Sequence, residues 1–80
     1  MFQHMIDLIH TDKGTYYIST NDTPDIGLET MVFKCKKKYP KTRNDIDWCE
    51  RYTEHHNNIN DAVKRHNEIK DNIEEYIKER

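Results

Sequence analysis

The stretch LETMVFKCK, residues 28–36, decides the fold because its apolar side chains fall on both faces of a strand. Side chains alternate between the two faces of a strand, so Met31 and Phe33 lie on one face. Leu28 and Val32 then lie on the other face. A strand that is apolar on both faces is typical of the interior of a sheet. We therefore expect residues 28–36 to form a central strand.

Two further stretches have the composition of strands that would pair with the central one. TYYIST, residues 15–20, is rich in β-branched and aromatic residues. DIDWCERYT, residues 45–53, also alternates, and one of its faces would carry the large apolar side chains of Ile46, Trp48 and Tyr52. We expect it to be a third strand, antiparallel to the central one and reached through a long, solvated basic connection over residues 36–44.

The N-terminal residues give a weaker signal. In residues 1–10 a loose alternation of apolar side chains is broken by Met5 and Ile9. The TDKG sequence that follows is typical of a turn. We interpret residues 1–14 as an N-terminal extension or a short strand, and residues 15–53 as the antiparallel sheet.

The C-terminal residues 58–79 carry the pattern of one long amphipathic helix. An apolar stripe at helical spacing runs through Ile59, Ala62, Val63, His66, Ile69, Ile73, Tyr76 and Ile77. Asn58 is a favourable N-cap, and Asp61 follows at a capping-box position. A helix over residues 58–78 is about 31 Å long, whereas a six-residue strand spans about 20 Å. We therefore expect the last turns of the helix to overhang the sheet and to need another surface.

These elements predict an α+β fold in a single domain over residues 1–80. Its expected form is a small antiparallel sheet of three to four strands, with one long C-terminal amphipathic helix packed on a face. The expected core combines side chains of the strands with the helical stripe: Tyr16, Ile18, Met31, Val32, Phe33, Trp48, Tyr52, Ile59, Ala62, Val63, Ile69 and Ile73.

Composition limits the size of the core and the class of protein. The chain has 80 residues, of which 34% are hydrophobic and 35% charged, so the core is small. No stretch approaches the roughly 18–20 apolar residues of a membrane span. MFQHMIDLIHTDKG has neither the basic nor the apolar region of a secretory signal. We expect a cytoplasmic protein without membrane contact, with Cys35 and Cys49 as free thiols.

The net charge of −2 conceals an uneven distribution. Residues 34–43, KCKKKYPKTR, hold six of the thirteen basic residues and no acidic residue. The other seventy residues therefore carry 7 basic and 15 acidic side chains, a balance of −8. One basic segment thus belongs to an otherwise acidic protein.

Four short motifs occur in order along the chain: IST (18–20), ETMVF (29–33), RYT (51–53) and A-x-x-x-H (Ala62 to His66). In these motifs the sequence resembles a widespread group of small, uncharacterised proteins encoded by tailed bacteriophages and prophages. The resemblance covers roughly residues 16–70. It implies a phage-type origin and a β-β-β-α order of elements, and it implies nothing catalytic.

The polar residues of the central strand belong either to the architecture or to a site. Glu29 is expected to pair with Arg51 on the neighbouring strand, an exposed ion pair worth about 0–1 kcal/mol. Alternatively, both residues join His66 in a polar binding patch. We favour His66 as a core histidine, bound to a strand carbonyl or to Tyr52. The candidate partner-binding residues are these two charged residues and the overhanging helix end: Glu29, Arg51, Ile73, Tyr76 and Ile77.

Other chemistries have weaker support in the sequence. The basic segment could bind nucleic acid through Lys36, Lys37, Lys38, Lys41 and Arg43. The pI of about 6.2 makes nucleic acid the less favoured partner. The cysteines and histidines lack the CxxC and HxxxH pairs of structural zinc sites, and Gly14 and Gly27 are too far apart for a phosphate loop. We expect no metal, no cofactor and no enzymatic activity.

The function that these observations favour is binding. We expect a non-enzymatic, phage-type accessory protein that acts by protein–protein interaction. Its expected role is that of an anti-CRISPR-like inhibitor of a host defence protein, such as a CRISPR effector, in the cytoplasm of the infected or lysogenic bacterium. Two alternatives stay open: a small homodimeric structural module, and a nucleic-acid-binding module that uses residues 34–43.

Overall fold

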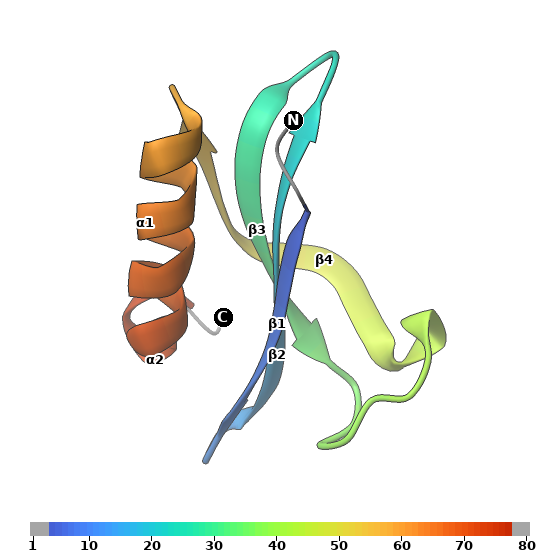
Figure 1. Ribbon diagram of the computed structural model, residues 1–80. Coiled ribbons are helices and arrows are strands. Elements are labelled where there is room, and N and C mark those ends of the chain that lie inside the picture. Colours follow the sequence, from blue (N-terminus) through green and yellow to red (C-terminus); the bar gives the residue numbers. More distant parts are fainter. Residues whose placement is uncertain (1–3, 78–80) are drawn as a thin grey trace.

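The computed structural model describes residues 4–77, which form four strands followed by two helices. The strands pair antiparallel in the order β1-β2-β3-β4, and they are β1 (Met5–Thr11), β2 (Gly14–Thr23), β3 (Gly27–Cys35) and β4 (Ile46–His56). The helices α1 (Ile59–Asp71) and α2 (Ile73–Tyr76) lie against one face of this sheet (Figure 1). The predicted α+β class is confirmed.

β1 and β2 form a tight hairpin at the N-terminal side of the sheet. Thr11 and Gly14 are opposite each other at its end. Gly14 has a φ of +142°, a backbone conformation that residues with a side chain rarely adopt. A Cβ at this position would also lie 3.3 Å from Cε of Lys34. The expected short N-terminal strand is therefore a full member of the sheet from Met5 onward, and residues 1–3 lie outside the described range.

β3 is central, as residues 28–36 predict, because it pairs with β2 on one side and β4 on the other. Ile18 lies opposite Val32, and Thr20 lies opposite Thr30. These four side chains are fully buried on the face that the helices cover, which we call the inner face. Met31 and the other alternate residues of β3 point to the outer face.

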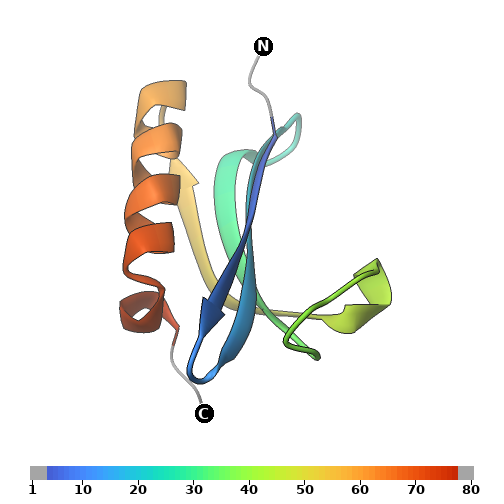
Figure 2. The same cartoon turned by 60° about the horizontal axis from the view of Figure 1, so that its bottom comes forward.

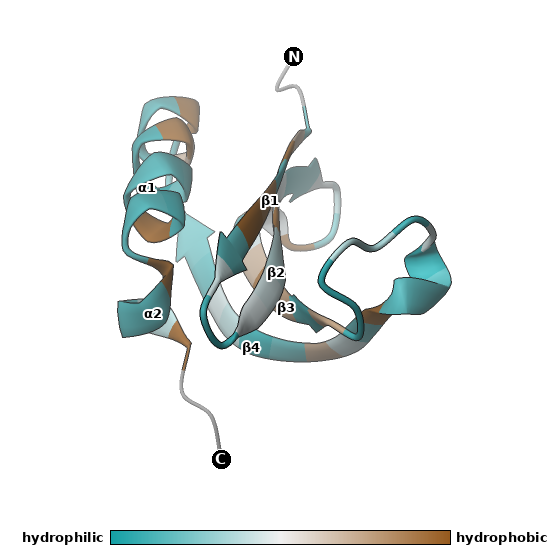
Figure 3. Ribbon diagram, turned by 90° about the horizontal axis from the view of Figure 1, so that it is seen from below, coloured by the Kyte–Doolittle hydropathy of each residue, from teal (hydrophilic) through white to brown (hydrophobic). Residues whose placement is uncertain are grey.

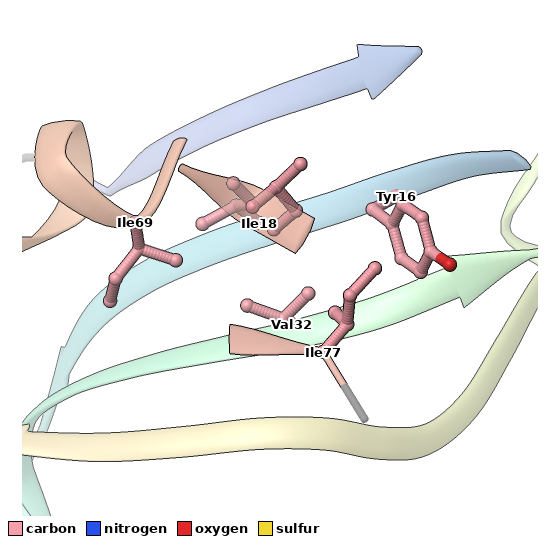
Figure 4. Close-up of a cluster of buried hydrophobic side chains, with 6 residues drawn as sticks. Tyr16, Ile18, Val32, Ile69 and Ile77 are labelled. Carbon is pink, nitrogen blue, oxygen red and sulfur yellow. The ribbon is translucent and has the colours of Figure 1, made fainter. Parts of the chain in front are cut away.

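The main core lies between the inner face and the helices (Figure 4). Burying one large aliphatic side chain contributes about 1.5–3 kcal/mol, so a core of this size stabilises a small domain modestly. It is formed by six buried side chains, three from the strands and three from the C-terminal segment: Tyr16, Ile18, Val32, Ile69, Ile73 and Ile77.

The expected C-terminal helix is present, but it is interrupted and therefore shorter than predicted. α1 ends at Asp71, where Asn72 caps it: its backbone N–H donates to the Glu68 carbonyl, as does its side-chain amide, at 3.0 Å. The chain then turns into the short α2. This break turns Ile73 and Ile77 back onto the sheet, where they are only 5% and 7% exposed. Within the described residues, the end of the helix therefore contributes to the core.

The predicted alternation of the third strand is also wrong in part. The pairing of β3 with β4 shifts register between Val32 and Phe33 and again between Phe33 and Lys34. Such bulges change which face a side chain occupies. Tyr52 packs on the inner core, whereas Ile46 lies in a second, outer cluster with Phe33 and Cys35.

Several predicted core residues lie elsewhere as a result. Met31 borders the outer cluster and is only partly buried. Three others are substantially exposed, at 45%, 46% and 36%: Trp48, Ile59 and Val63. The apolar stripe predicted for the helix was therefore too wide, because the side chains that α1 buries are mainly those of Ala62, His66 and Ile69.

Candidate binding surface

The outer face of the sheet carries an apolar surface that the helices leave uncovered. Figure 2 and Figure 3 show α1 and α2 on one side of the sheet, and the connection between β3 and β4 projecting on the opposite side. The pairing of the strands puts Leu8 beside Tyr17, and Tyr17 beside Phe33. We call this surface the open face, and it consists of Ile6, Leu8, Tyr17, Met31, Phe33 and Trp48.

Three large side chains of the open face are strongly exposed. Ile6 and Leu8 on β1 are 49% and 43% exposed, and Trp48 on β4 is 45% exposed. Single exposed apolar residues are ordinary, but a contiguous group is typical of a site of interaction. Within the described residues, these three belong to one side of one sheet. The open face is therefore the candidate site.

Trp48 is exposed but firmly held. Its ring meets Phe33 and Tyr17 edge-on, with centroids 5.0 and 5.7 Å apart. Its indole N–H donates to the Arg43 carbonyl at 3.1 Å, and the Arg43 guanidinium lies 5.2 Å from the ring centroid. Aromatic pairs and cation–π contacts of this kind fix a ring at little entropic cost. An ordered, half-exposed tryptophan is the side chain most enriched among interface anchors.

The basic connection is largely exposed to solvent, as expected, and hydrogen bonds also anchor it to the rest of the protein. Lys36 N–H donates to the Asp45 carbonyl at 2.6 Å, and the Thr15 hydroxyl donates to the Lys38 carbonyl at 2.7 Å. The Asp45 carboxylate accepts the backbone N–H groups of Lys41 and Thr42, which lowers the pKa of that carboxyl. The connection ends in a short 3-10 turn, η1 (Arg43–Asp45), directly before β4.

The connection places positive charge beside the open face. All five predicted nucleic-acid residues are exposed on it: Lys36, Lys37, Lys38, Lys41 and Arg43. Asp45 pairs with Lys37 at 3.4 Å, which leaves most of this charge uncompensated within the segment. Of these five residues, Arg43 lines a depression of about 300 Å³ on the open face, together with Tyr17, Ser19, Met31, Phe33 and Trp48 among others.

The predicted pair of Glu29 and Arg51 does not form. Glu29 lies opposite His55 and pairs with its ring at 3.1 Å, while Arg51 pairs with Asp47 on its own strand at 3.2 Å. His66 lies on the inner side of the sheet, so the alternative patch of these three residues is not assembled either.

The predicted residues of the helix end are part of the interior. Ile73 and Ile77 are core residues. Tyr76 is partly buried, edge-on to Tyr52 with the ring centroids 5.1 Å apart, and the Arg65 guanidinium lies 5.4 Å from its ring centroid. These three residues therefore take part in the packing of the helices against the sheet.

A second feature lies beneath α1, where polar side chains form a line of close contacts across the sheet. The Nε2 of His66 lies 2.7 Å from Asp7 Oδ2, and its Nδ1 lies 2.6 Å from Thr20 Oγ1. The line continues with Thr20 to Thr30 at 2.6 Å, and with Thr30 to His56 Nε2 at 2.7 Å. We call this the polar network, and in order it consists of Asp7, His66, Thr20, Thr30, His56 and Glu54.

The network satisfies polar groups that the core buries. Thr20, Thr30 and His66 are fully buried, and among the described residues every buried side-chain nitrogen and oxygen has a hydrogen-bond partner. A buried polar group without a partner costs about 1–3 kcal/mol, so the network is stabilising only while it is complete. It connects α1 with all four strands, because its members come from each of these elements.

Glu54 is fixed at the end of the network by Arg65 of α1. Nε and Nη2 of Arg65 donate to the two carboxylate oxygens at 2.7 and 2.8 Å, and the Tyr52 hydroxyl donates at 2.6 Å. This two-pronged pairing lowers the pKa of Glu54 to about 2. Burial lowers the pKa of His56, against the opposing effect of the Glu54 carboxylate.

Sequence reasoning missed this network, although its signals were present. Thr20 and Thr30 alternate in phase with Ile18 and Val32, so they had to face inward. His66 lies on the apolar stripe of the helix. These three residues belong to the quoted motifs IST, ETMVF and A-x-x-x-H, which the fold brings together.

The remaining chemistry of the described residues is sparse. Cys35 is buried and Cys49 exposed, both as free thiols, and burial raises the pKa of Cys35. In residues 4–77 no three His, Cys, Asp or Glu side chains gather in a way that suits a metal ion. None of the helices in that range has the length and apolar character that crossing a membrane requires.

Comparisons with protein-family models, with curated proteins and with solved structures found no match for this chain.

Proposed function

We propose that this is a non-enzymatic protein that acts by binding another protein through the open face of its sheet. The observation that carries the proposal is the contiguous exposure of Ile6, Leu8 and Trp48 on one side of an ordered sheet. Burying three such side chains would remove a substantial apolar area from water at about 25 cal/mol per Å². A rigid aromatic anchor surrounded by aliphatic side chains is the usual centre of a protein interface.

The rim of the open face defines the chemistry of the partner. Arg43 borders the aromatic cluster, and the exposed lysines at residues 36–41 belong to the same connection. A matching partner surface therefore presents an apolar side chain for the depression and carboxylates beside it, because opposite charges steer and align the encounter. The exposed aliphatic side chains of β1 favour a protein over nucleic acid, whose bases stack mainly on aromatic rings.

The identity of the partner rests on the sequence resemblance. The four motifs resemble those of small proteins of tailed phages and prophages, so we propose a host defence protein, such as a CRISPR effector, as the target. The protein would then act as an anti-CRISPR-like inhibitor in the cytoplasm of the infected or lysogenic bacterium. The surface that supports this proposal is the open face and not the end of the helix.

A specific observation also favours the nucleic-acid alternative. Trp48 and the guanidinium of Arg43 stack within the same basic rim, and such a pair could hold a base while lysines contact phosphates. Against it, Phe33 is only 6% exposed and cannot offer a face for stacking. A second copy of the chain on the open face is the remaining alternative.

Capture from a nuclease-treated lysate of bacteria that carry defence systems would test the proposal. The baits are the unaltered protein, Leu8→Glu on the open face and, as a matched control, Val63→Glu on α1, which is also apolar and exposed. We expect one protein to be retained by the unaltered and Val63→Glu baits and reduced at least about tenfold by Leu8→Glu, because a buried unpaired carboxylate costs more than the roughly 1.4 kcal/mol that this factor represents.

The other outcomes overturn the proposal. Equal retention by Leu8→Glu would place the partner elsewhere. If the bait captures only nucleic acid, and this dissociates as the salt concentration rises, the basic segment would be the binding site. A homodimer in sedimentation, lost in Leu8→Glu, would make a second copy the occupant of the open face.

A further inference from the structure

The position of each hydrogen in the polar network follows from which of its groups can donate and which can only accept. An ionised carboxylate only accepts, so the short contact with Asp7 requires a hydrogen on Nε2 of His66. When His66 is neutral, its Nδ1 must then accept from the Thr20 hydroxyl. Thr20 has no second hydrogen, so it accepts from Thr30, and Thr30 in turn accepts from Nε2–H of His56.

This arrangement fits the observed distances. With both histidines neutral, one hydrogen occupies each of the four positions between Asp7 and His56, where the heavy atoms are 2.6–2.7 Å apart. The fifth position, between His56 Nδ1 and Glu54 Oε2, has no hydrogen, and it is the widest at 3.5 Å. Both imidazoles therefore carry their hydrogen on Nε2.

One added proton fits the network. Nδ1 of His56 faces the Glu54 carboxylate, so a proton taken up there completes the fifth position. If each of the three hydrogens between His66 and His56 crosses to the other heavy atom of its own contact, the same positive charge lies on His66 instead. The two histidines thus hold one proton between them, as coupled titrating sites do.

A second proton does not fit. With two imidazolium rings, Thr20 accepts from His66 and Thr30 accepts from His56, so both hydroxyl hydrogens compete for the position between the threonines. That pair is fully buried and 2.6 Å apart, with no room for two hydrogens. The side chain of His56 is only 2% exposed, so water cannot take over the lost hydrogen bond.

The surroundings of the histidines set how the first proton is received. His56 faces Glu54 and His55 from β4, and Asp61 and Arg65 from α1. The carboxylates favour its charged form, whereas burial and the cationic neighbours oppose it.

His66 faces the Asp7 carboxylate of β1, which is partly exposed to solvent. The network therefore has one carboxylate at each end and no other charged member.

We propose that the polar network is an acid-sensitive latch, which holds α1 on the sheet while at most one proton is shared by His56 and His66 and releases α1 when a second is bound. The latch belongs to the protein itself and operates without any partner. It would couple the packing of α1, through the two threonines, to the pH around the protein.

Nitrogen NMR of the histidine rings in the full-length protein tests the latch. At neutral pH we expect both His56 and His66 to be Nε2–H tautomers. On acidification we expect uptake of one proton by the pair, seen in the ring shifts of both residues. The second proton should coincide with loss of amide protection across Ile59–Asp71.

The variant Thr30→Val separates the latch from ordinary core packing. It removes the central hydroxyl while keeping a β-branched side chain, so the shifts of His66 should no longer follow the titration of His56. An Nδ1–H tautomer of either ring at neutral pH would overturn the proposal. Two imidazolium rings with α1 still protected would also overturn it, and both results come from the unaltered protein even if the variant fails to fold.

Discussion

Thr20 and Thr30 are small residues with a large structural role. Each hydroxyl is fully buried, and each both donates and accepts within the polar network. The adjacent Glu29 and Thr30 of β3 point to opposite faces of the sheet. Glu29 points to the outer face and pairs with His55, while Thr30 points inward and joins His66 to β4 through Thr20.

Replacing Thr20 by Val should destabilise the protein by about 1–3 kcal/mol, although the two side chains have nearly the same shape. The change leaves the acceptor of His66 and the donor of Thr30 without their partner. Unfolding in urea would measure it. Thr53→Val, which removes a hydroxyl near the surface, is the control and should change stability by less than about 0.5 kcal/mol. Equal effects of the two changes would contradict the role of the network.

Stability should fall as the solution is acidified, in two steps. Burial lowers the pKa of His56 in the folded protein below its ordinary value of 6.5, so its contribution to stability is present above pH 6.5 and is lost as pH falls below it. The pKa of Glu54 is lowered from 4.5 to about 2, so its contribution is lost as pH falls from 4.5 toward 2.

Urea unfolding at pH 7.5, 5.5 and 3.5 would measure both steps. Glu54→Gln should flatten the lower step, since an amide does not titrate. Stability that stays constant or rises from pH 7.5 to 5.5 would contradict the assignment of His56 as a buried, neutral group.

At the scale of elements, the sequence predicted what depends on local pattern. The central position of β3 follows from its two apolar faces, and the start of the helix follows from Asn58, whose side chain accepts the N–H of Asp61 at 2.9 Å. The end of α1 was also marked, because Asn72 is a residue that favours helix ends. An apolar stripe that continued into Ile73 obscured this signal.

The features that the sequence could not predict depend on distant neighbours. The register shifts around Phe33 arise from the pairing of β3 with β4. They place Trp48 on the outer face and Tyr52 on the inner face, although the sequence predicted one face for both. The polar network joins His66 to Asp7, 59 residues earlier in the chain, and no local pattern specifies such a bond.

The segment after α1 should contribute to stability as part of the core. Ile73→Ala removes a side chain that is 5% exposed and packs with the strands, so the expected loss is about 2–5 kcal/mol. Ile59→Ala is the matched control, because Ile59 is 46% exposed and should change stability by less than about 0.5 kcal/mol. Thermal or urea unfolding would compare them. A negligible effect of Ile73→Ala would contradict its place in the core and would favour a helix whose end lies beyond the sheet.

At the scale of the whole molecule, the two sides of the sheet differ because the helices cover only one of them. The inner side holds the core and the polar network under the helices, and the outer side displays the open face beside the basic segment. Three large apolar side chains are exposed on the outer side, and a contiguous group of this kind is typical of a site of interaction. This arrangement is the basis on which we propose that the protein acts by binding.

Site-specific photo-crosslinking in living cells tests that central claim most directly. A photoreactive aromatic residue would replace Leu8 or Trp48 on the open face, or Val63 on the helix as the control, in bacteria that carry defence systems. We predict that positions 8 and 48 form an adduct with the same protein and that position 63 does not. An adduct from position 63 alone, or no protein adduct from positions 8 and 48, would contradict binding through the open face.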